Sequence, residues 1–267
     1  MAGPIPICTE ALIQRWVQDG RGQGEGERYF PWYTIFDVRG PSLRTRIEGT
    51  KTSRTYHLLS LLELILFYHH ELRPSVLDIR EQFPLFPREE CWEIAKMIGV
   101  KHPAAKETGC PTVVTTDQLV TVQNGLTRRW EAWSVKYCSD LAKPRTLEKL
   151  EIERRYWRQR NIPWRLFTDA DTTPALLHNY RFLHPYREFK SLCHLPAGFR
   201  EDVSRVLREE VGPDTILSTL CSECDRIWRQ QPGSSLQVAR HLLANGVWPL
   251  DIWKPITPRA PLVFRAS

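Results

Sequence analysis

Residues that could carry out chemistry gather between Thr112 and Cys138. This stretch consists of two runs rich in β-branched and aromatic residues on either side of Asn124 and Gly125. Asn-Gly is the strongest short-range signal for a type I′ turn, so we expect a β-hairpin here. With Asn124 and Gly125 as the two turn residues, Asp117 on the first strand lies opposite Ala132 on the second.

Ser134 and Lys136 are expected on the same face of this hairpin as Asp117, because side chains alternate along a strand. An error of one residue in the loop would place them on opposite faces. In the expected register, a carboxylate, a hydroxyl and an ammonium group converge on a surface that is otherwise apolar. An Asp followed on the neighbouring strand by x-Val-Lys is the outline of the Asp…(Glu/Asp/Gln)-x-Lys nuclease site.

The chemistry of phosphodiester cleavage explains these residue types. A hard cation such as Mg²⁺ takes one or two carboxylates plus water, a backbone carbonyl and phosphate oxygens. It makes hydroxide available near neutral pH, and a nearby lysine can orient the water or neutralise developing charge. The alternative is that Asp117 and Lys136 form an exposed cross-strand ion pair that has no function. The pattern alone does not exclude this alternative.

Longer runs of the sequence resemble the TnsA family, the endonuclease subunits of heteromeric cut-and-paste bacterial transposases. The similarity covers the chain from Ser53 to Asp169, and its most specific runs are DIREQFPL and RTLEKLEIERRYW. The resemblance implies a restriction-endonuclease-like catalytic domain whose motif is a helix Glu, a strand Asp and then Gln-x-Lys. These motif positions correspond to Glu63, Asp117 and Lys136, which are the expected catalytic residues.

The resemblance also implies a metal site. Glu63 and Asp117 would hold Mg²⁺, for which Mn²⁺ would substitute, and Glu153 would point toward the same site. Ser134 stands where the family often has Gln, and a hydroxyl is a shorter and poorer ligand than an amide. We therefore expect the backbone carbonyl of Val135 to be the ligand on this strand, with Ser134 only at the edge of the site.

The partners implied by the resemblance are double-stranded DNA at the transposon ends, a DDE-type transposase subunit that cuts the 3′ strands, and an AAA+ ATPase regulator. This chain would cut the 5′ strands. The alternative function is a DNA-binding or adaptor subunit that keeps the nuclease fold without activity. The Ser at position 134 is the feature that favours this alternative.

Glu63 is expected in the first turn of a helix. Ser60 is a good N-cap, and the residues after it predict a helix from Leu61 to Leu72 that ends before Arg73-Pro74. A first-turn Glu is often only a capping-box or helix-dipole residue. The residues alone leave this alternative open.

A basic helix is expected after Pro144, over the run TLEKLEIERRYWRQRN. Arg154, Arg155 and Arg158 are candidates for contacts with DNA phosphates. They follow several glutamates at helical spacing, so a solvated helix face with i,i+4 ion pairs is the alternative.

The remaining elements predict an α/β fold. The run SVLDIREQFPLF predicts a strand ending at Pro84, on which Gln82, with Asp78 and Glu81, could line the edge of the site. A helix over 88–98 and a strand at WRLF complete a mixed sheet covered by helices. Before them, Thr9 caps a short helix, and the Gly-rich run DGRGQGEG predicts a flexible linker, since no Lys-Ser/Thr follows it.

We expect four regions in the chain. Residues 1–50 hold an N-terminal helix and extended segments, 51–170 the catalytic domain, 171–253 a small helical domain of winged-helix-like type, and 254–267 a flexible tail. Helices are predicted over 199–211, 215–228 and 235–245. Cys221 and Cys224, with Cys193 and His194, could bind zinc, but a mid-helix C-x-x-C without a second pair favours ordinary packing.

Composition sets the broad class of the protein. In 267 residues, 42% apolar content with 10 Trp is ample for a packed core, so the composition favours a folded chain over a disordered one. The formal net charge of +6 suits a polyanionic partner such as DNA. Seven dispersed cysteines, no signal segment and no apolar run long enough for a bilayer predict a soluble intracellular protein without membrane contact. The resemblance to subunits of bacterial transposases then implies the bacterial cytoplasm.

Overall fold

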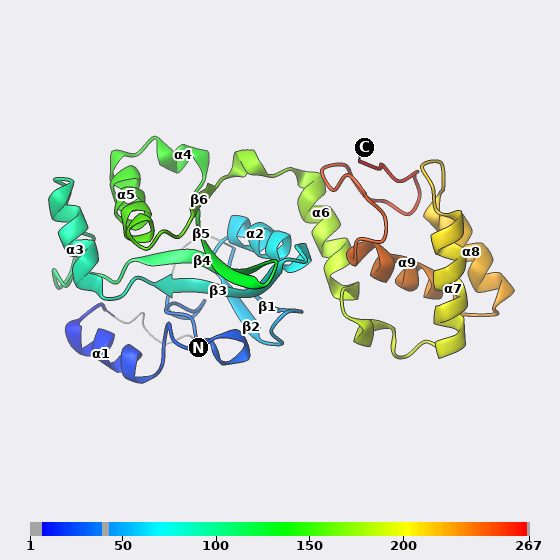
Figure 1. The fold of residues 1–267 in the computed structure, drawn as a ribbon, viewed down its shortest axis with the longest axis horizontal. Coiled ribbons are helices and arrows are strands. Elements are labelled where there is room, and N and C mark those ends of the chain that lie inside the picture. The colour runs from blue at the N-terminus through cyan, green and yellow to red at the C-terminus, as the bar shows by residue number, and fades with distance from the viewer. Residues whose placement is uncertain (1–6, 39–42, 266–267) are drawn as a thin grey trace. The chain divides into compact units, whose positions relative to one another are not determined.

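The computed structural model describes residues 7–38 and 43–265 of the chain. It divides into two compact units, Met1–Asp171 and Thr172–Ser267 (Figure 1). The first unit is a mixed α/β structure and the second is built from helices. We describe each unit by itself.

The main sheet of the first unit has four strands in the order β3-β4-β5-β6. Strand β3 pairs antiparallel with β4, β4 pairs antiparallel with β5, and β5 pairs parallel with β6. A separate antiparallel pair, β1-β2, precedes it in the chain. The strands are β1 (Thr45–Glu48), β2 (Thr55–Leu58), β3 (Val76–Pro84), β4 (Thr115–Asn124), β5 (Thr127–Val135) and β6 (Trp164–Phe167).

Helices cover both faces of the main sheet, as the sequence predicts (Figure 1). Leu119 and Ala132 pack in one apolar cluster with residues of α3 and α5. Gln118 points the other way, and its amide contacts α2. The helices of this unit are α1 (Glu10–Gln18), α2 (Leu61–Leu72), α3 (Arg88–Met97), α4 (Cys138–Leu141) and α5 (Pro144–Gln159), with 3₁₀ turns at Gly26–Arg28 and Asp169–Asp171.

The expected hairpin register is wrong by two residues. Asn124 pairs with Thr127, which leaves Gly125 and Leu126 in the turn, and Leu119 rather than Asp117 lies opposite Ala132. Gly125 has φ +59, a conformation that favours glycine. Because the shift is even, it does not by itself exchange the two faces of the hairpin.

Local signals predict several elements well. Ser60 caps α2 through its side chain, and the helix covers Leu61–Leu72 as expected. Strand β3 ends at Pro84, and Thr9 caps α1. These boundaries depend on the residues at the boundary itself, so no distant contact is needed to predict them.

The Gly-rich run after α1 is not a flexible linker. The Gly22 amide donates to the Phe30 carbonyl at 2.5 Å, and the Phe30 amide returns a bond to the Gln23 carbonyl at 3.2 Å. The Gly26 amide donates to Asp78 on β3 at 3.2 Å. These bonds close the run into a loop anchored on the main sheet.

Within its described residues, 172–265, the second unit contains four α-helices, two 3₁₀ turns and their connections. The predicted helices correspond to α7 (Ala197–Glu210), α8 (Leu217–Ile227) and α9 (Ser234–Ala244). The sequence analysis missed α6 (Pro174–Leu183), which Thr173 caps, and the 3₁₀ turns His184–Tyr186 and Phe189–Leu192.

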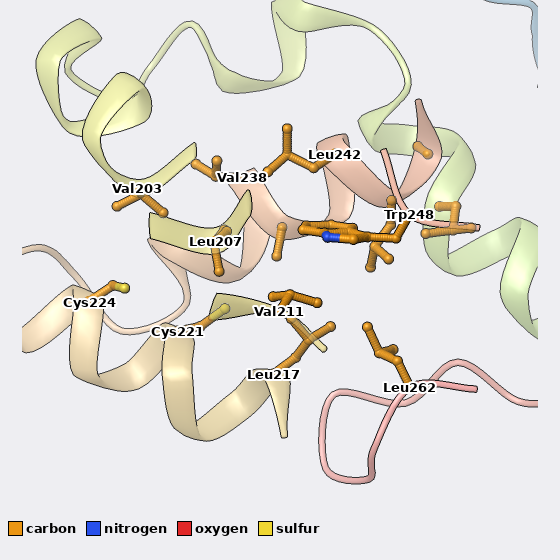
Figure 2. Packing of buried hydrophobic residues seen from close by; sticks show 14 of the residues in the cluster. Val203, Leu207, Val211, Leu217, Cys221, Cys224, Val238, Leu242, Trp248 and Leu262 are labelled. Atoms are coloured by element: carbon orange, nitrogen blue, oxygen red, sulfur yellow. The ribbon is translucent and has the colours of Figure 1, made fainter. Parts of the chain in front are cut away.

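The C-terminal segment is part of this unit, so the expectation of a flexible tail is wrong for the described residues to 265. Ile256 and Leu262 are buried in the apolar cluster of the unit, and Figure 2 shows Leu262 within it. Isolated β-bridges join Pro261 to Ile216 and Phe264 to Leu250. Short apolar groups between prolines can fill a helical core without forming a regular element, which the local pattern does not reveal.

Cys221 and Cys224 lie in the same cluster, and Figure 2 shows the Cys221 side chain beside Leu207 and Val211. Burial raises the pKa of the Cys221 thiol to about 12. Cys193 is exposed on another segment. None of the helices within 7–38 and 43–265 is both long enough and apolar enough to cross a bilayer.

Candidate active site

Five elements bring the expected site residues together at one end of the main sheet. Strand β4 contributes Asp117, strand β5 ends at Val135 just before Lys136, and strand β3 contributes Gln82. The first turn of α2 and the middle of α5 contribute the two further carboxylates, Glu63 and Glu153.

Glu63 combines both alternatives that the sequence leaves open. Its Oε1 accepts a hydrogen bond from Ser60 Oγ at 3.0 Å, and its Oε2 accepts one from the Leu59 amide at 3.0 Å, so the side chain caps α2. The same Oε2 lies 3.4 Å from the amide nitrogen of Gln82. The carboxylate is 6% exposed and faces the site from the helix end.

Gln82 links the two acidic residues. Its Nε2 lies 3.3 Å from Asp117 Oδ1 and 3.4 Å from Glu63 Oε2, while its Oε1 accepts a bond from Thr115 at 3.1 Å. The residue has φ +48, which is uncommon for a residue other than glycine. Backbone strain of this kind is often found where a side chain is positioned for function.

Lys136 occupies the position expected of a cation. Its Nζ donates to the Val135 carbonyl at 2.6 Å and to Asp117 Oδ2 at 3.3 Å. The same Oδ2 accepts the Val135 amide at 2.6 Å. The ammonium group therefore bridges the two oxygen atoms that the sequence analysis assigns to the metal.

Ser134 holds Glu153 instead of facing the site. Its hydroxyl donates to Glu153 Oε1 at 2.5 Å and accepts a bond from Trp164 Nε1 at 3.0 Å. Glu153 Oε1 also accepts a bond from Thr116 at 2.7 Å. With both its donor and acceptor engaged, Ser134 positions the carboxylate on α5.

The carboxylates of the site oppose one another's ionisation. Burial, and then the charge of Asp117, raise the pKa of Glu63 to about 8 and that of Glu153 to about 7. Burial disfavours the charge of Lys136, but Asp117, Glu153 and Glu63 outweigh it and raise its pKa. Near neutral pH the raised pKa values keep Glu63 largely and Glu153 partly protonated, and binding of a divalent cation would favour their ionised forms.

The donor set fits Mg²⁺ better than a softer metal. Within 7–38 and 43–265, no three His, Cys, Asp or Glu side chains form a ready-made cage. Mg²⁺ does not need one, because it takes one or two carboxylates and keeps several water molecules. Asp117 Oδ2 and the Val135 carbonyl already share one cation, so the residues present fit such an ion.

The arginines of α5 lie on its outer face. Arg154 and Arg155 both bond to Glu151, at 2.7 Å and 2.6 Å, in the i,i+3 and i,i+4 spacing of a solvated helix. Arg158 is exposed. This arrangement matches the alternative that the sequence analysis left open, and contact with DNA remains a prediction for all three residues.

Several residues that hold the site carboxylates in place were not predicted from the sequence. Thr116 receives a bond from Trp157 Nε1 at 2.6 Å and passes its own to Glu153. On the opposite face, His70 bonds Gln118 at 2.9 Å, and Gln118 bonds the Glu63 carbonyl at 2.9 Å. In the sequence, only the position of Thr116 directly before Asp117 points to any of these contacts.

Comparison with known proteins identifies the family of the chain. Residues 73–169 match the family model described as TnsA-like endonuclease N terminal, and residues 172–252 match that described as TnsA endonuclease C terminal. The chain is 39% identical over 254 residues to the Transposon Tn7 transposition protein TnsA of Escherichia coli. This match covers 95% of this chain and 90% of that protein. The chain belongs to the TnsA family. As a TnsA family member it is the endonuclease subunit of a transposase, which confirms the resemblance and the main functional expectation.

Proposed function

We propose that this TnsA family member hydrolyses a phosphodiester bond in the 5′ strands at transposon ends, during cut-and-paste transposition. Its first unit would be the restriction-endonuclease-like catalytic domain. The observation that carries the proposal is the bridge from Lys136 Nζ to Asp117 Oδ2 and the Val135 carbonyl, beside Glu63. An ion pair without a function would not require two further buried carboxylates at the same place.

The residues have separate roles in this proposal. Asp117, Glu63 and the Val135 carbonyl would hold Mg²⁺ or Mn²⁺, with Glu153 supporting them from α5. Bound Mg²⁺ supplies positive charge to the scissile phosphate and makes hydroxide available near neutral pH. Lys136 would orient the attacking water once it moves off the Val135 carbonyl, and Gln82 would bridge the two carboxylates through its side-chain amide.

The Ser at position 134 does not favour the inactive-adaptor alternative in this geometry. Its hydroxyl positions Glu153, and the amide that the family often carries on this strand has a counterpart in Gln82 on β3. The site thus keeps two carboxylates, a lysine and an amide within mutual reach.

The remaining roles belong to partners and to the second unit. We propose that Arg154, Arg155 and Arg158 contact DNA phosphates, and that a DDE-type subunit cuts the 3′ strands under an AAA+ ATPase regulator. The second unit would be winged-helix-like and would dock these partners.

The decisive experiment is donor excision with the partner subunits present, with nicks mapped on both strands. Wild-type protein should give 5′-strand nicks at the transposon ends, and Asp117→Asn should leave only the 3′-strand nicks. Unchanged 5′ nicks in Asp117→Asn would contradict the proposal.

A further inference from the structure

A cavity lies beside β3, outside the catalytic site. It has a volume of ≈ 560 Å³ and is lined by Gly22, Gly24, Glu25, Arg28, Arg80 and Phe83. The Gly-rich loop forms one wall and β3 forms the other. Arg80 and Gln82 are two residues apart on this strand, a distance of about 7 Å between their backbone positions.

Arg80 is a buried cation whose ion pairs with its two flanking carboxylates are long. Its side chain is 4% exposed, yet the nearest carboxylate oxygens are 3.6 Å away on Asp78 and 3.7 Å away on Glu25. Its one hydrogen bond, to Thr121, is 3.5 Å long. Charge-assisted bonds are normally about 2.7–2.9 Å long, so these contacts only partly satisfy the guanidinium.

Arg54 provides a comparison, because it bonds Glu81, the residue next to Arg80 on β3. The hydrogen-bond donors of its guanidinium are better satisfied than those of Arg80. Arg54 bonds both carboxylate oxygens of Glu81, one of them at 2.9 Å, and the Ile79 carbonyl at 2.7 Å. Burial opposes the charge of Arg54, but Glu81 outweighs it and the pKa is raised. For Arg80, burial prevails and the pKa is lowered.

Aromatic rings hold the Arg80 guanidinium in place. Its central carbon lies 4.7 Å from the ring centre of Trp130 and 5.2 Å from that of Phe83. Stacking of this kind orients a guanidinium without using its hydrogen-bond donors. The donors therefore stay available to a ligand in the cavity.

The Gly-rich loop adds further donors. Within the described residues, the backbone amides of Gly24 and Glu25 donate to no protein acceptor. The loop needs glycine at Gly24, since φ is +86 and a Cβ there would lie 2.4 Å from the Arg28 carbonyl oxygen. Free amides beside positive-φ residues are typical of loops that bind phosphate. Arg28, exposed and without a carboxylate partner among the described residues, completes the positive wall.

We propose that this cavity binds a backbone phosphate of DNA next to the cut site, through Arg80, Arg28 and the loop amides. The proposal rests on the proposed function, because DNA supplies the phosphate. Glu25 is 71% exposed in its side chain and acts as a loose counter-ion that the phosphate displaces. The contact fixes the register of the cut strand relative to Asp117.

The test is binding of the complete chain and its partner transposase subunit to labelled end duplexes in EDTA, so that cleavage plays no part. Single phosphates near the cut are replaced by neutral methylphosphonates. In the wild type, one position should weaken binding about tenfold, as expected for a charge-assisted contact. In Arg28→Ala and in Arg80→Met, the methylphosphonate at that position should weaken binding clearly less than it does in the wild type.

Two further variants separate the contact from general charge effects. Glu25→Gln should strengthen binding at the same position, because it removes the competing carboxylate. Arg46→Ala, an exposed arginine on β1, removes the same charge and should leave the position-specific effect intact. Arg28→Ala alters only an exposed side chain, so its result does not depend on whether Arg80→Met folds.

Two results would overturn the proposal. One is a methylphosphonate profile that is the same in wild type and Arg28→Ala, and this would leave the nuclease assignment untouched. The other is that millimolar pyrophosphate, at constant ionic strength, binds in the cavity while no methylphosphonate position in the DNA affects binding. That result would assign the cavity to a small phosphate ligand.

Discussion

Asp117 and Lys136 share a contact but have different tasks in the proposed reaction. Asp117→Asn should lose Mn²⁺ binding and 5′-strand cutting together, because a neutral amide replaces the carboxylate ligand. Lys136→Met should keep Mn²⁺ binding while cutting falls, because the ammonium group holds no metal. Calorimetric Mn²⁺ titration and nick mapping with the partner subunits measure the two effects. Normal metal binding by Asp117→Asn together with none by Lys136→Met would contradict the site as drawn.

The buried carboxylates make the stability of the metal-free protein depend on pH. Glu63 has a pKa of about 8 in the folded state, raised from 4.5. Between these values the folded protein holds a proton that the unfolded chain has released, so stability falls as pH rises from about 4.5 to 8. The contribution is at most about 1.4 kcal/mol per pH unit for one group.

Glu63→Gln should remove this contribution. The measurement is urea unfolding in EDTA at pH 5, 6, 7 and 8, comparing the variant with the wild type at each pH. The stability difference should move in favour of the variant as pH rises, since other titrating groups cancel in the comparison. Mn²⁺ affinity of the wild type should rise over the same range because binding requires the carboxylates to be ionised. A pH-independent difference would place Glu63 outside the coupled site.

At the scale of elements, Arg54 and Glu81 join the β1-β2 pair to the main sheet. Glu81 is fully buried, bonds Arg54, and accepts the His57 amide of β2 at 3.0 Å. Arg54→Met should destabilise the protein by about 3–5 kcal/mol, because it leaves a buried carboxylate without its partner. Urea unfolding measures the loss. The double variant Arg54→Met with Glu81→Gln should recover much of it, and equal losses in the single and double variants would rule out the charge as the cause.

The two faces of helix α5 carry residues with different proposed roles. Glu153 faces the site, whereas Arg154 and Arg155 lie on the outer face and share Glu151. Replacing both arginines by Glu should make the negative slope of log affinity for DNA against log salt less steep. Its magnitude should fall by about 0.9 for each phosphate that the protein no longer neutralises. Glu151→Gln is the matched control, which frees both arginines and should not weaken binding. An unchanged slope in the double variant would make this face a solvated one.

At the scale of the whole molecule, the chain divides at Asp171. A fragment ending there should fold and bind Mn²⁺, because every proposed metal ligand belongs to the first unit. The fragment needs Asp171 itself, since its carboxylate accepts bonds from the amide and the hydroxyl of Thr168 at 2.9 Å and 2.8 Å. Thermal melting and Mn²⁺ titration of the fragment test this, with limited proteolysis expected to cut near the boundary. A folded fragment without Mn²⁺ affinity would place a ligand in the second unit.

The sequence by itself determined the features that depend on neighbours along the chain. Ser60 and the residues after it set the start of α2, Pro84 ended β3, and strand alternation put Asp117 and Lys136 on one face. Capping, proline geometry and alternation act over a few residues, so no fold is needed to see them. The family resemblance then connected Glu63 with the hairpin.

Tertiary structure decided what depends on contacts between distant segments. The hairpin shifted by two residues, Ser134 turned to Glu153 on α5, and Leu262 entered the core of the second unit. The Gly-rich run became a wall of a cavity because Asp78 and Arg80 lie on the strand beside it. Each of these outcomes is a choice among locally permitted arrangements, and the free energy that selects one comes from burial and hydrogen bonds across the fold.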